Sequence, residues 1–275
     1  MKEKVEKTMQ RYFIAPELFL ESSVAIVGDD AHHLSRVMRA KAGDQVIVSD
    51  GMSREALVRL REPAKDRVEA DIIEWLPMTH EPAVEVWIAQ SLPKGDKMEL
   101  VIQKGTEIGA DRFVPFVSER TVVQLDAKKE GKRIERWQKI AKEAAEQAHR
   151  NRVPAVEAPH SWKQLLQLIP QMDAAWICYE KESGLAFKEQ IQEALSKSKA
   201  FRIDSSDGEG TGHLGQRLKL MLVIGPEGGF TEQEVQASEA AGCRSVSLGR
   251  RILRTETAAM VGLTCILYET GEMGG

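Results

Sequence analysis

The sequence has few of the residues that build metal centres and disulfide frameworks. Its three cysteines, Cys178, Cys243 and Cys265, lie far apart in apolar surroundings, form no CxxC pair and have no nearby histidine. Thiols in such surroundings are typical of a packed core. We therefore predict neither a metal site nor a disulfide.

Long apolar segments are also missing. No stretch approaches the length of a membrane-spanning helix, and the beginning of the chain is rich in Lys and Glu, unlike a secretion signal. With 42% hydrophobic and 29% charged residues, the composition is typical of a soluble globular protein. We expect a cytoplasmic protein without a membrane partner, whose 275 residues suffice for one large or two ordinary domains.

An excess of positive charge is absent as well. The chain has 38 basic and 42 acidic residues, a net charge of −4, which argues weakly against a nucleic-acid partner. The basic residues form three clusters, however, and that pattern indicates a selective phosphate binder of near-neutral charge. Each cluster taken alone is better explained as a solvated face. The clusters are Arg36, Arg39 and Lys41; His149, Arg150 and Arg152; and Arg250, Arg251 and Arg254.

What the chain does contain is a pair of glycine-containing loops in its last quarter, at 225–230 and 249–254, each following an apolar segment. A helix is expected after each loop. Thr231 and Glu234 are spaced as a capping box for the first helix, and Thr255 can cap the second. Two strand-loop-helix units in tandem predict neighbouring parallel strands, with ligands bound at the carboxyl ends of the strands.

The glycines of these loops supply backbone without a Cβ atom, which can adopt positive φ and let a flat ligand lie against the main chain. Such loops suit an adenine group or a small polar cofactor. Ordinary strand-to-helix turns are the alternative for either loop taken alone. The two loops together, with Glu227 and three arginines beside them, favour a ligand site.

Two motifs carry a resemblance to a known family. The sequences IGPEGGF at 224–230 and LGRRILRTETA at 248–258 resemble the cofactor motifs of the 16S ribosomal RNA uridine-N3 methyltransferase family, in the SPOUT class. Residues 90–99, 103–109 and 146–148 fit the same family, so the resemblance spans nearly the whole chain. GPEGG alone also resembles turns of other SPOUT enzymes, whereas GPEGG followed by LRTETA at this distance is close to diagnostic.

The resemblance implies a fold and a cofactor. The fold is α/β: a knotted (SPOUT) parallel-sheet methyltransferase domain at 77–275 with a C-terminal trefoil knot, preceded by a small PUA-like β-barrel RNA-binding domain at 1–76. Members of the class are typically homodimers. The cofactor is a bent S-adenosylmethionine lying among three loops, with its adenine packed on apolar side chains. The implied cofactor-binding residues are Tyr179, Gly225, Glu227, Gly228, Gly229, Leu248, Gly249, Ile252, Leu253 and Thr255.

The implied reaction moves a methyl group from a sulfonium to a ring nitrogen that carries a proton. Donor and acceptor must be held in line, and a cation beside the uracil carbonyls would stabilise the developing negative charge. We assign that role to Arg254, with contact to RNA phosphate or to a dimer partner as its alternative. Glu227 is the nearest candidate proton acceptor. Its alternative role is to fix the loop by accepting backbone N–H bonds, with water taking the proton.

The first 76 residues contain short segments broken by turns, which predict strands of a small β-barrel with one helix from about 29 to 38. By resemblance, this PUA-like domain helps to place a structured rRNA segment while the target base leaves its stack. A polar helix start is the alternative explanation for His32. The candidate RNA-binding residues are Arg11, His32, Arg36, Arg39, Arg150 and Arg152.

Beyond a proline-containing linker, strand and helix patterns alternate. They predict strands at 84–89 and 112–117 and helices at 97–108 and about 134–150, an α/β arrangement with a parallel sheet. The segment 204–216 is polar and glycine-rich, and we expect an exposed loop there. Its GxGxxG spacing follows no strand, so we do not interpret it as a nucleotide site.

The leading hypothesis is S-adenosylmethionine-dependent methylation of uracil N3 in 16S rRNA of the small ribosomal subunit, with no DNA partner. The nearest alternative is a 2′-O-ribose methyltransferase of the same class that acts on tRNA or 23S rRNA. A second alternative is a non-enzymatic RNA-binding protein of ribosome assembly. The sequence leaves open the target nucleotide, the general base, and whether free rRNA or an assembled particle is the substrate.

Overall fold

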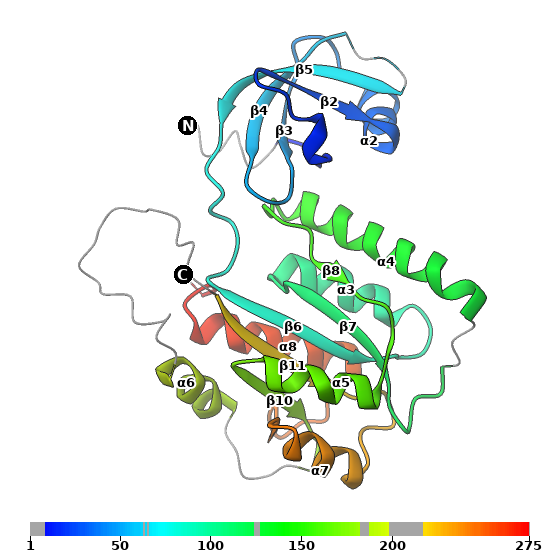
Figure 1. The fold of residues 1–275 in the computed structure, drawn as a ribbon, viewed down its shortest axis with the longest axis vertical. Helices are drawn as coiled ribbons and strands as arrows, with labels where there is room; N and C mark the ends of the chain where they lie inside the picture. The colour runs from blue at the N-terminus through cyan, green and yellow to red at the C-terminus, as the bar shows by residue number, and fades with distance from the viewer. Residues whose placement is uncertain are drawn as a thin grey trace. The chain divides into compact units, whose positions relative to one another are not determined.

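The computed structural model describes residues 9–62, 64, 66–123, 127–181, 187–197 and 217–274. The chain divides into two units (Figure 1). The first unit consists of Met1–Glu81 and Lys142–Val153, and the second of Pro82–Ala141 and Pro154–Gly275. Each unit has its own core.

The first unit is built on a five-stranded sheet in the order β1-β3-β4-β5-β2. β1 pairs with β3 in parallel, and the other neighbours are antiparallel. The sheet curls into a half-barrel (Figure 1). The expected barrel is therefore open, because no pairing among the described residues joins β1 to β2. The strands are β1 (Arg11–Phe13), β2 (Ser23–Val27), β3 (Gln45–Ser49), β4 (Glu55–Leu60) and β5 (Arg67–Trp75).

The concave side of this sheet is closed by apolar side chains and one short helical segment. The expected helix is present as α2 (Gly28–His32), which continues into the wider turn η2 (His33–Val37). Ala31 and Leu34 of this segment are buried in the same core as the alternating residues Val46 and Val48. A short turn, η1 (Pro16–Leu18), follows β1.

The second unit is built on a parallel sheet in the order β12-β10-β11-β6-β7-β8, with β9 also beside β7. Every pairing in it is parallel, which confirms the expected α/β arrangement. β10 lies between β11 and β12, so the expectation that the two glycine loops leave neighbouring strands is wrong. The strands are β6 (Val84–Ser91), β7 (Arg112–Val117), β8 (Ala155–Val156), β9 (His160–Ser161), β10 (Ala174–Cys178), β11 (Leu218–Ile224) and β12 (Arg244–Val246).

Helices cover both faces of this sheet (Figure 1). α8 approaches β11 so closely that a Cβ atom on Gly262 would lie 2.3 Å from the Leu222 side chain. No helix among the described residues is both long and apolar enough to span a membrane. The helices are α3 (Lys97–Ile108), α4 (Ala127–Gln147), α5 (Trp162–Leu168), η3 (Ile169–Gln171), α6 (Phe187–Lys197), α7 (Glu232–Ala240) and α8 (Thr255–Glu269).

The helix starts show where local sequence signals decide structure. α3 has the expected bounds, but the side chain of Asp96 makes no capping hydrogen bond. The sequence predicted Thr255 as the cap of α8. In the structure the cap is Arg254 and Thr255 is the first helical residue, so that prediction is wrong.

The strand order does not by itself define a knot, and the C-terminal knot stays a prediction. The segment 204–216, with its GxGxxG spacing, lies outside the described residues.

Candidate active site

A cavity of about 610 Å³ lies at the carboxyl ends of β10, β11 and β12. Three loops enclose most of it, one after each strand. Every residue that the sequence analysis assigned to cofactor binding or catalysis lines this one cavity. These residues are Tyr179, Gly225, Glu227, Gly228, Gly229, Leu248, Gly249, Ile252, Leu253, Arg254 and Thr255.

The loop after β11 is held by the capping box expected from the sequence. The Thr231 side chain accepts a hydrogen bond from the backbone of Glu234, and the Glu234 carboxylate accepts one from the Thr231 N–H. Glu234 also accepts a hydrogen bond from the Glu119 N–H at 2.8 Å, which joins the start of α7 to the segment after β7. Phe230 and Val235 are buried in one core cluster, as a hydrophobic staple requires. The start of α7 is therefore confirmed.

Glycine is favoured at two positions in these loops, for a different physical reason at each. Gly229 has a φ of +66°, and a Cβ atom there would lie 2.7 Å from the Glu180 carboxylate. Gly249 has a φ of +119°, and a Cβ atom there would meet no atom within 4 Å. Gly229 thus permits a tight turn against a neighbouring loop, whereas Gly249 leaves open space beside the backbone.

Glu227 is tied to the start of α3. Its Oε1 accepts hydrogen bonds from Lys97 Nζ at 2.7 Å and from the Lys94 N–H at 3.1 Å. Burial acts to raise the pKa of Glu227, but the hydrogen bonds, with that from Lys97 foremost, leave this pKa below its ordinary value. A carboxylate held in this way is a weak base at neutral pH. The contacts fit the alternative in which Glu227 fixes the loop better than they fit a proton acceptor.

Thr255 joins the ends of two strands. Its hydroxyl donates a hydrogen bond to the Gly225 carbonyl at 2.6 Å and accepts one from Gln90 Nε2 at 2.8 Å. Gln90 is fully buried at the end of β6. Gln90 belongs to the family motif at 90–99, but the sequence alone indicates no role for it. A buried amide at the end of an apolar strand is the signal that would have identified it.

The loop after β12 is open to solvent. Arg250, Arg251 and Arg254 are exposed, and within the described part of the chain their guanidinium groups have no ion-pair or hydrogen-bond partner. Ile252 is 89% exposed. Cationic and apolar groups are thus available to a ligand or a partner on this side of the cavity.

Two of the expected RNA-binding residues are placed differently from the prediction. Arg11 is 4% exposed and forms a buried ion pair with Glu55, while a second hydrogen bond runs to the Arg150 carbonyl at 3.0 Å. Arg150 is also 4% exposed and pairs with Glu81 at 2.5 Å. This burial contradicts the expectation that Arg11 and Arg150 contact RNA.

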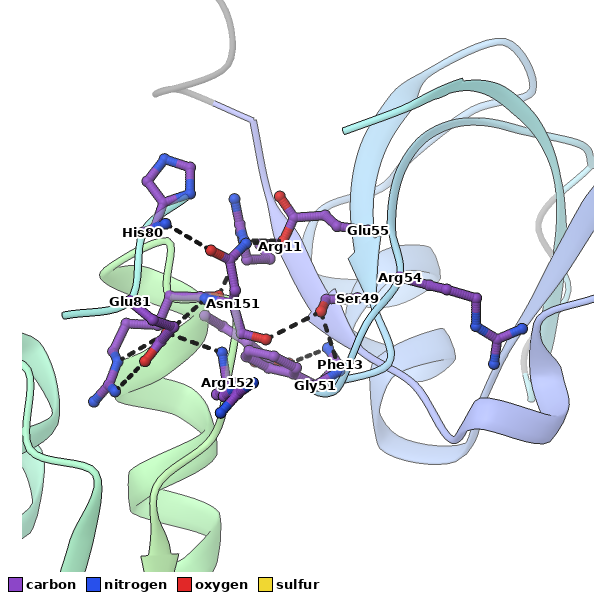
Figure 2. A network of polar contacts seen from close by, with 12 residues as sticks. Arg11, Phe13, Ser49, Gly51, Arg54, Glu55, His80, Glu81, Asn151 and Arg152 are labelled. Atoms are coloured by element: carbon purple, nitrogen blue, oxygen red, sulfur yellow. Dashed lines mark hydrogen bonds and ion pairs between the residues drawn. The ribbon is translucent and has the colours of Figure 1, made fainter. Parts of the chain in front are cut away.

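These arginines belong to a polar network inside the first unit (Figure 2). Asn151 donates a hydrogen bond from Nδ2 to Glu55 at 2.7 Å and accepts one from the His80 N–H at 2.7 Å. Glu81 accepts hydrogen bonds from the backbone N–H groups of Asn151 and Arg152 at 2.9 and 3.0 Å. The network fixes the backbone that presents Arg152. Four expected RNA-binding residues are exposed in the first unit: His32, Arg36, Arg39 and Arg152.

The cysteines occupy the second unit. Cys243 is buried, and burial raises the pKa of both the Cys178 and the Cys243 thiols. A raised thiol pKa disfavours the thiolate that a reactive or metal-binding cysteine needs. Cys178 lines the cavity from the end of β10.

Family models match both parts of the chain. A model described as an RNA methyltransferase domain matches residues 80–267, and one described as an RNA methyltransferase PUA domain matches residues 26–73. The ribosomal RNA small subunit methyltransferase E of Bacillus subtilis is 43% identical over 97% of this chain and 99% of its own length. The chain belongs to the ribosomal RNA small subunit methyltransferase E family.

Further relatives extend the agreement to known structures. The family member from Synechocystis is 34% identical over 93% of this chain and 76% of its own length. A crystal structure of the Neisseria gonorrhoeae family member, bound to S-adenosyl methionine, is 28% identical, with a TM-score of 0.75, and covers 94% of this chain and 97% of that one. The expected resemblance and the two-part fold are confirmed, and S-adenosylmethionine is the cofactor of this family.

The cavity of this chain fits that cofactor. Its volume lies within the range of about 300–1,000 Å³ that is usual for ligand pockets. Its lining combines apolar side chains, Leu248 and Leu253 among them, with charged groups that include Lys97 and Glu227. The open space beside Gly249 lets a flat group lie against the main chain. A nucleoside with a charged amino-acid end matches this mixture of surfaces.

Proposed function

We propose that this protein methylates N3 of a uracil in 16S rRNA of the small ribosomal subunit, with S-adenosylmethionine as methyl donor. Residues 77–275 form the SPOUT methyltransferase domain and residues 1–76 the RNA-binding PUA-like domain. The observation that carries the proposal is that every expected cofactor residue, contributed by three separate loops, lines one cavity in a chain of this family.

The cofactor would be held mainly by the loops after β11 and β12. Leu248, Ile252 and Leu253 would pack on the adenine, and backbone groups of the glycine-containing turns would approach it. When bound, S-adenosylmethionine supplies a methyl group that its sulfonium has already activated. The chain therefore has to exclude water from the cavity and to hold the acceptor base in line.

Arg254 is the residue that we assign to the acceptor base. It lines the cavity, it is exposed, and no described residue pairs with its guanidinium group. A free guanidinium can stabilise the negative charge that develops on a uracil as N3 loses its proton. Glu227 already accepts two hydrogen bonds, so we assign it to holding the cofactor loop.

The RNA is bound by exposed basic residues outside the cavity. His32, Arg36, Arg39 and Arg152 are accessible in the first unit, where they would contact phosphate. We further propose that the protein works as a homodimer in the cytoplasm. Arg250 and Arg251, exposed beside the cavity, would face the RNA or the second copy.

The decisive experiment is methyl transfer to defined ribosomal particles. Purified protein and labelled S-adenosylmethionine are incubated with small subunits, free 16S rRNA, tRNA and large subunits from cells that lack the enzyme. The RNA is then digested to nucleosides for mass spectrometry. We expect label only in small-subunit RNA, as 3-methyluridine. Label in an alkali-resistant 2′-O-methyl nucleoside would replace this function with ribose methylation, and no label in any RNA would support a non-enzymatic role.

A further inference from the structure

A charged cluster beside the cavity includes two residues, Lys97 and Glu256, that have no role in the function proposed above. Lys97 at the start of α3 lies between two carboxylates, Glu227 after β11 and Glu256 in the first turn of α8. Lys97 Nζ is 2.7 Å from Glu227 Oε1 and 3.6 Å from Glu256 Oε2. Lys97 and Glu227 both line the cavity. We call these three residues the Glu–Lys–Glu cluster.

The cluster contains more negative than positive charge. The hydrogen bond from Lys97 to Glu227 raises the pKa of Lys97, and despite burial the pKa of Glu227 lies below its ordinary value. Both groups are therefore ionised at neutral pH and form one close pair. Glu256 adds a second carboxylate, so the cluster has a formal charge of −1.

Glu256 is the less satisfied of the two carboxylates. The residue is 8% exposed, and no described residue donates a hydrogen bond to its buried Oε2 atom. Its separation from Lys97 is longer than a hydrogen bond. The helix dipole favours an acidic residue in the first turn of α8, but it does not require that residue to be buried. Lys97 lies within ion-pair distance of this Oε2 atom and is shared between the two carboxylates, so it compensates the burial of Glu256 only in part.

The cavity is also lined by positive charge. Arg250, Arg251 and Arg254 line it from the loop after β12. No described residue neutralises them. A positively charged ligand group would be repelled there and attracted to the Glu–Lys–Glu cluster. The cavity therefore offers a positively charged ligand group one unfavourable and one favourable set of charges.

The cofactor has such a positively charged end. Its amino-acid portion carries an α-ammonium group and an α-carboxylate, and the adjoining sulfur is a sulfonium, so this end has a net formal charge of +1. We propose that the Glu–Lys–Glu cluster is the counter-charge for this cationic end of S-adenosylmethionine. In this arrangement Glu256 is a positioning residue, which sets the net charge of the cluster and holds Lys97 at the cavity wall. The inference rests on the cofactor site of the proposed function.

Titration calorimetry with three adenosine compounds tests the inference. S-adenosylmethionine has both positive groups, S-adenosylhomocysteine has only the ammonium, and 5′-methylthioadenosine has neither. In Glu256→Gln, we expect the affinity for S-adenosylmethionine to fall about tenfold, the size of one partly screened charge interaction. The affinity for 5′-methylthioadenosine should stay within about twofold of wild type, because that compound has no cationic end.

Matched variants separate charge from folding. Glu269→Gln removes one carboxylate from the same helix about 20 Å away, at the rise of 1.5 Å per residue, and should change none of the three affinities. Glu256→Asp keeps the charge and should retain most of the preference for S-adenosylmethionine. Thermal melting without ligand shows whether each variant is folded.

The outcomes are distinct. A loss shared by S-adenosylmethionine and S-adenosylhomocysteine places the ammonium at the cluster, and a loss confined to S-adenosylmethionine places the sulfonium there; both support the inference. Equal weakening of all three compounds, or unchanged binding of S-adenosylmethionine, overturns it. If the wild-type protein binds none of the compounds, the proposed function itself has failed.

Discussion

Two groups of arginines look alike in the sequence and differ in the structure. Arg11 and Arg150 of the first unit are buried in ion pairs with Glu55 and Glu81. Arg250, Arg251 and Arg254 of the second unit are exposed, and the described residues offer them no partner. The charges of the first group are neutralised by ion pairs inside the protein, whereas the charges of the second group are available to a ligand. An arginine therefore indicates a binding surface only when no carboxylate from elsewhere in the chain neutralises it.

The largest effect that this comparison predicts is on stability. Arg11→Met removes the cationic member of the buried ion pair with Glu55. We expect the free energy of unfolding to fall by about 3–5 kcal/mol, the usual cost of breaking such a pair from one side. Urea denaturation measures this quantity. Arg36→Met, at an exposed position, is the matched control and should change it by less than about 0.5 kcal/mol. Similar losses of unfolding free energy in both variants would show that the buried Arg11 contributes no more to stability than the exposed Arg36.

The next largest effect is on turnover. Arg254→Ala should lower kcat by about 10²–10³-fold, as expected when one donor to a developing negative charge is lost. The dissociation constant of S-adenosylmethionine should change little, because our proposal assigns the adenine to Leu248, Ile252 and Leu253. Single-turnover kinetics and calorimetry give the two quantities separately. Arg254→Lys retains the charge and should recover part of the rate. Equal losses of rate and cofactor affinity would reassign Arg254 to cofactor binding or folding.

A pH effect is expected in the first unit, where Glu146 is largely buried. Its Oε1 accepts a hydrogen bond from the Phe13 N–H at 3.0 Å, and Lys142 lies 3.7 Å away. Burial raises the pKa of Glu146 to about 7, more than its partners lower it. The folded protein then holds this proton at pH values where the unfolded chain has released it. The free energy of unfolding should fall between about pH 4.5 and 7, by at most about 1.4 kcal/mol per pH unit.

The measurement for Glu146 is a comparison of two stability profiles. Urea denaturation of the wild type and of Glu146→Gln is followed from pH 5 to 8, and the difference between the curves isolates this carboxyl from other titrating groups such as His149. We expect the variant to gain stability relative to wild type as the pH rises. Parallel curves would show that Glu146 titrates normally.

The smallest effect concerns RNA affinity. Arg36→Ala should weaken binding to 16S rRNA and reduce the slope of log affinity against log salt by about 1, because one phosphate contact is lost. Arg61 is the matched control in the same unit, since its guanidinium is exposed but already paired with Asp71. Filter binding at several salt concentrations measures both slopes. A larger change for Arg61→Ala than for Arg36→Ala would show that exposure without a partner does not identify the RNA-binding arginines.

Local signals in the sequence predicted local structure well. The capping box of Thr231 and Glu234 and the bounds of α3 are present as expected, because each depends on residues a few positions apart. The glycine loops and the residues of the cavity were also found from sequence motifs. β8, β9 and α5 were missed, since elements of two to seven residues give almost no periodic signal.

Non-local contacts account for the remaining differences. Arg11 is buried by Glu55, 44 residues away, and no spacing rule connects two such positions. β10 lies between β11 and β12 although it precedes both in the chain, and strand order is a property of the whole sheet. Gln90 and Lys97 acquire their roles only when the ends of β6, β11 and α8 meet. These features require the fold before they can be recognised.

The most direct test of the account is a crystal structure of this protein with S-adenosylmethionine. The account predicts the cofactor in the cavity at the ends of β10, β11 and β12, with its adenine against Leu248 and Leu253 and its amino-acid end toward Lys97. Cofactor bound elsewhere on the chain, or an adenine that lies beside Lys97 and Glu227 instead, would contradict it.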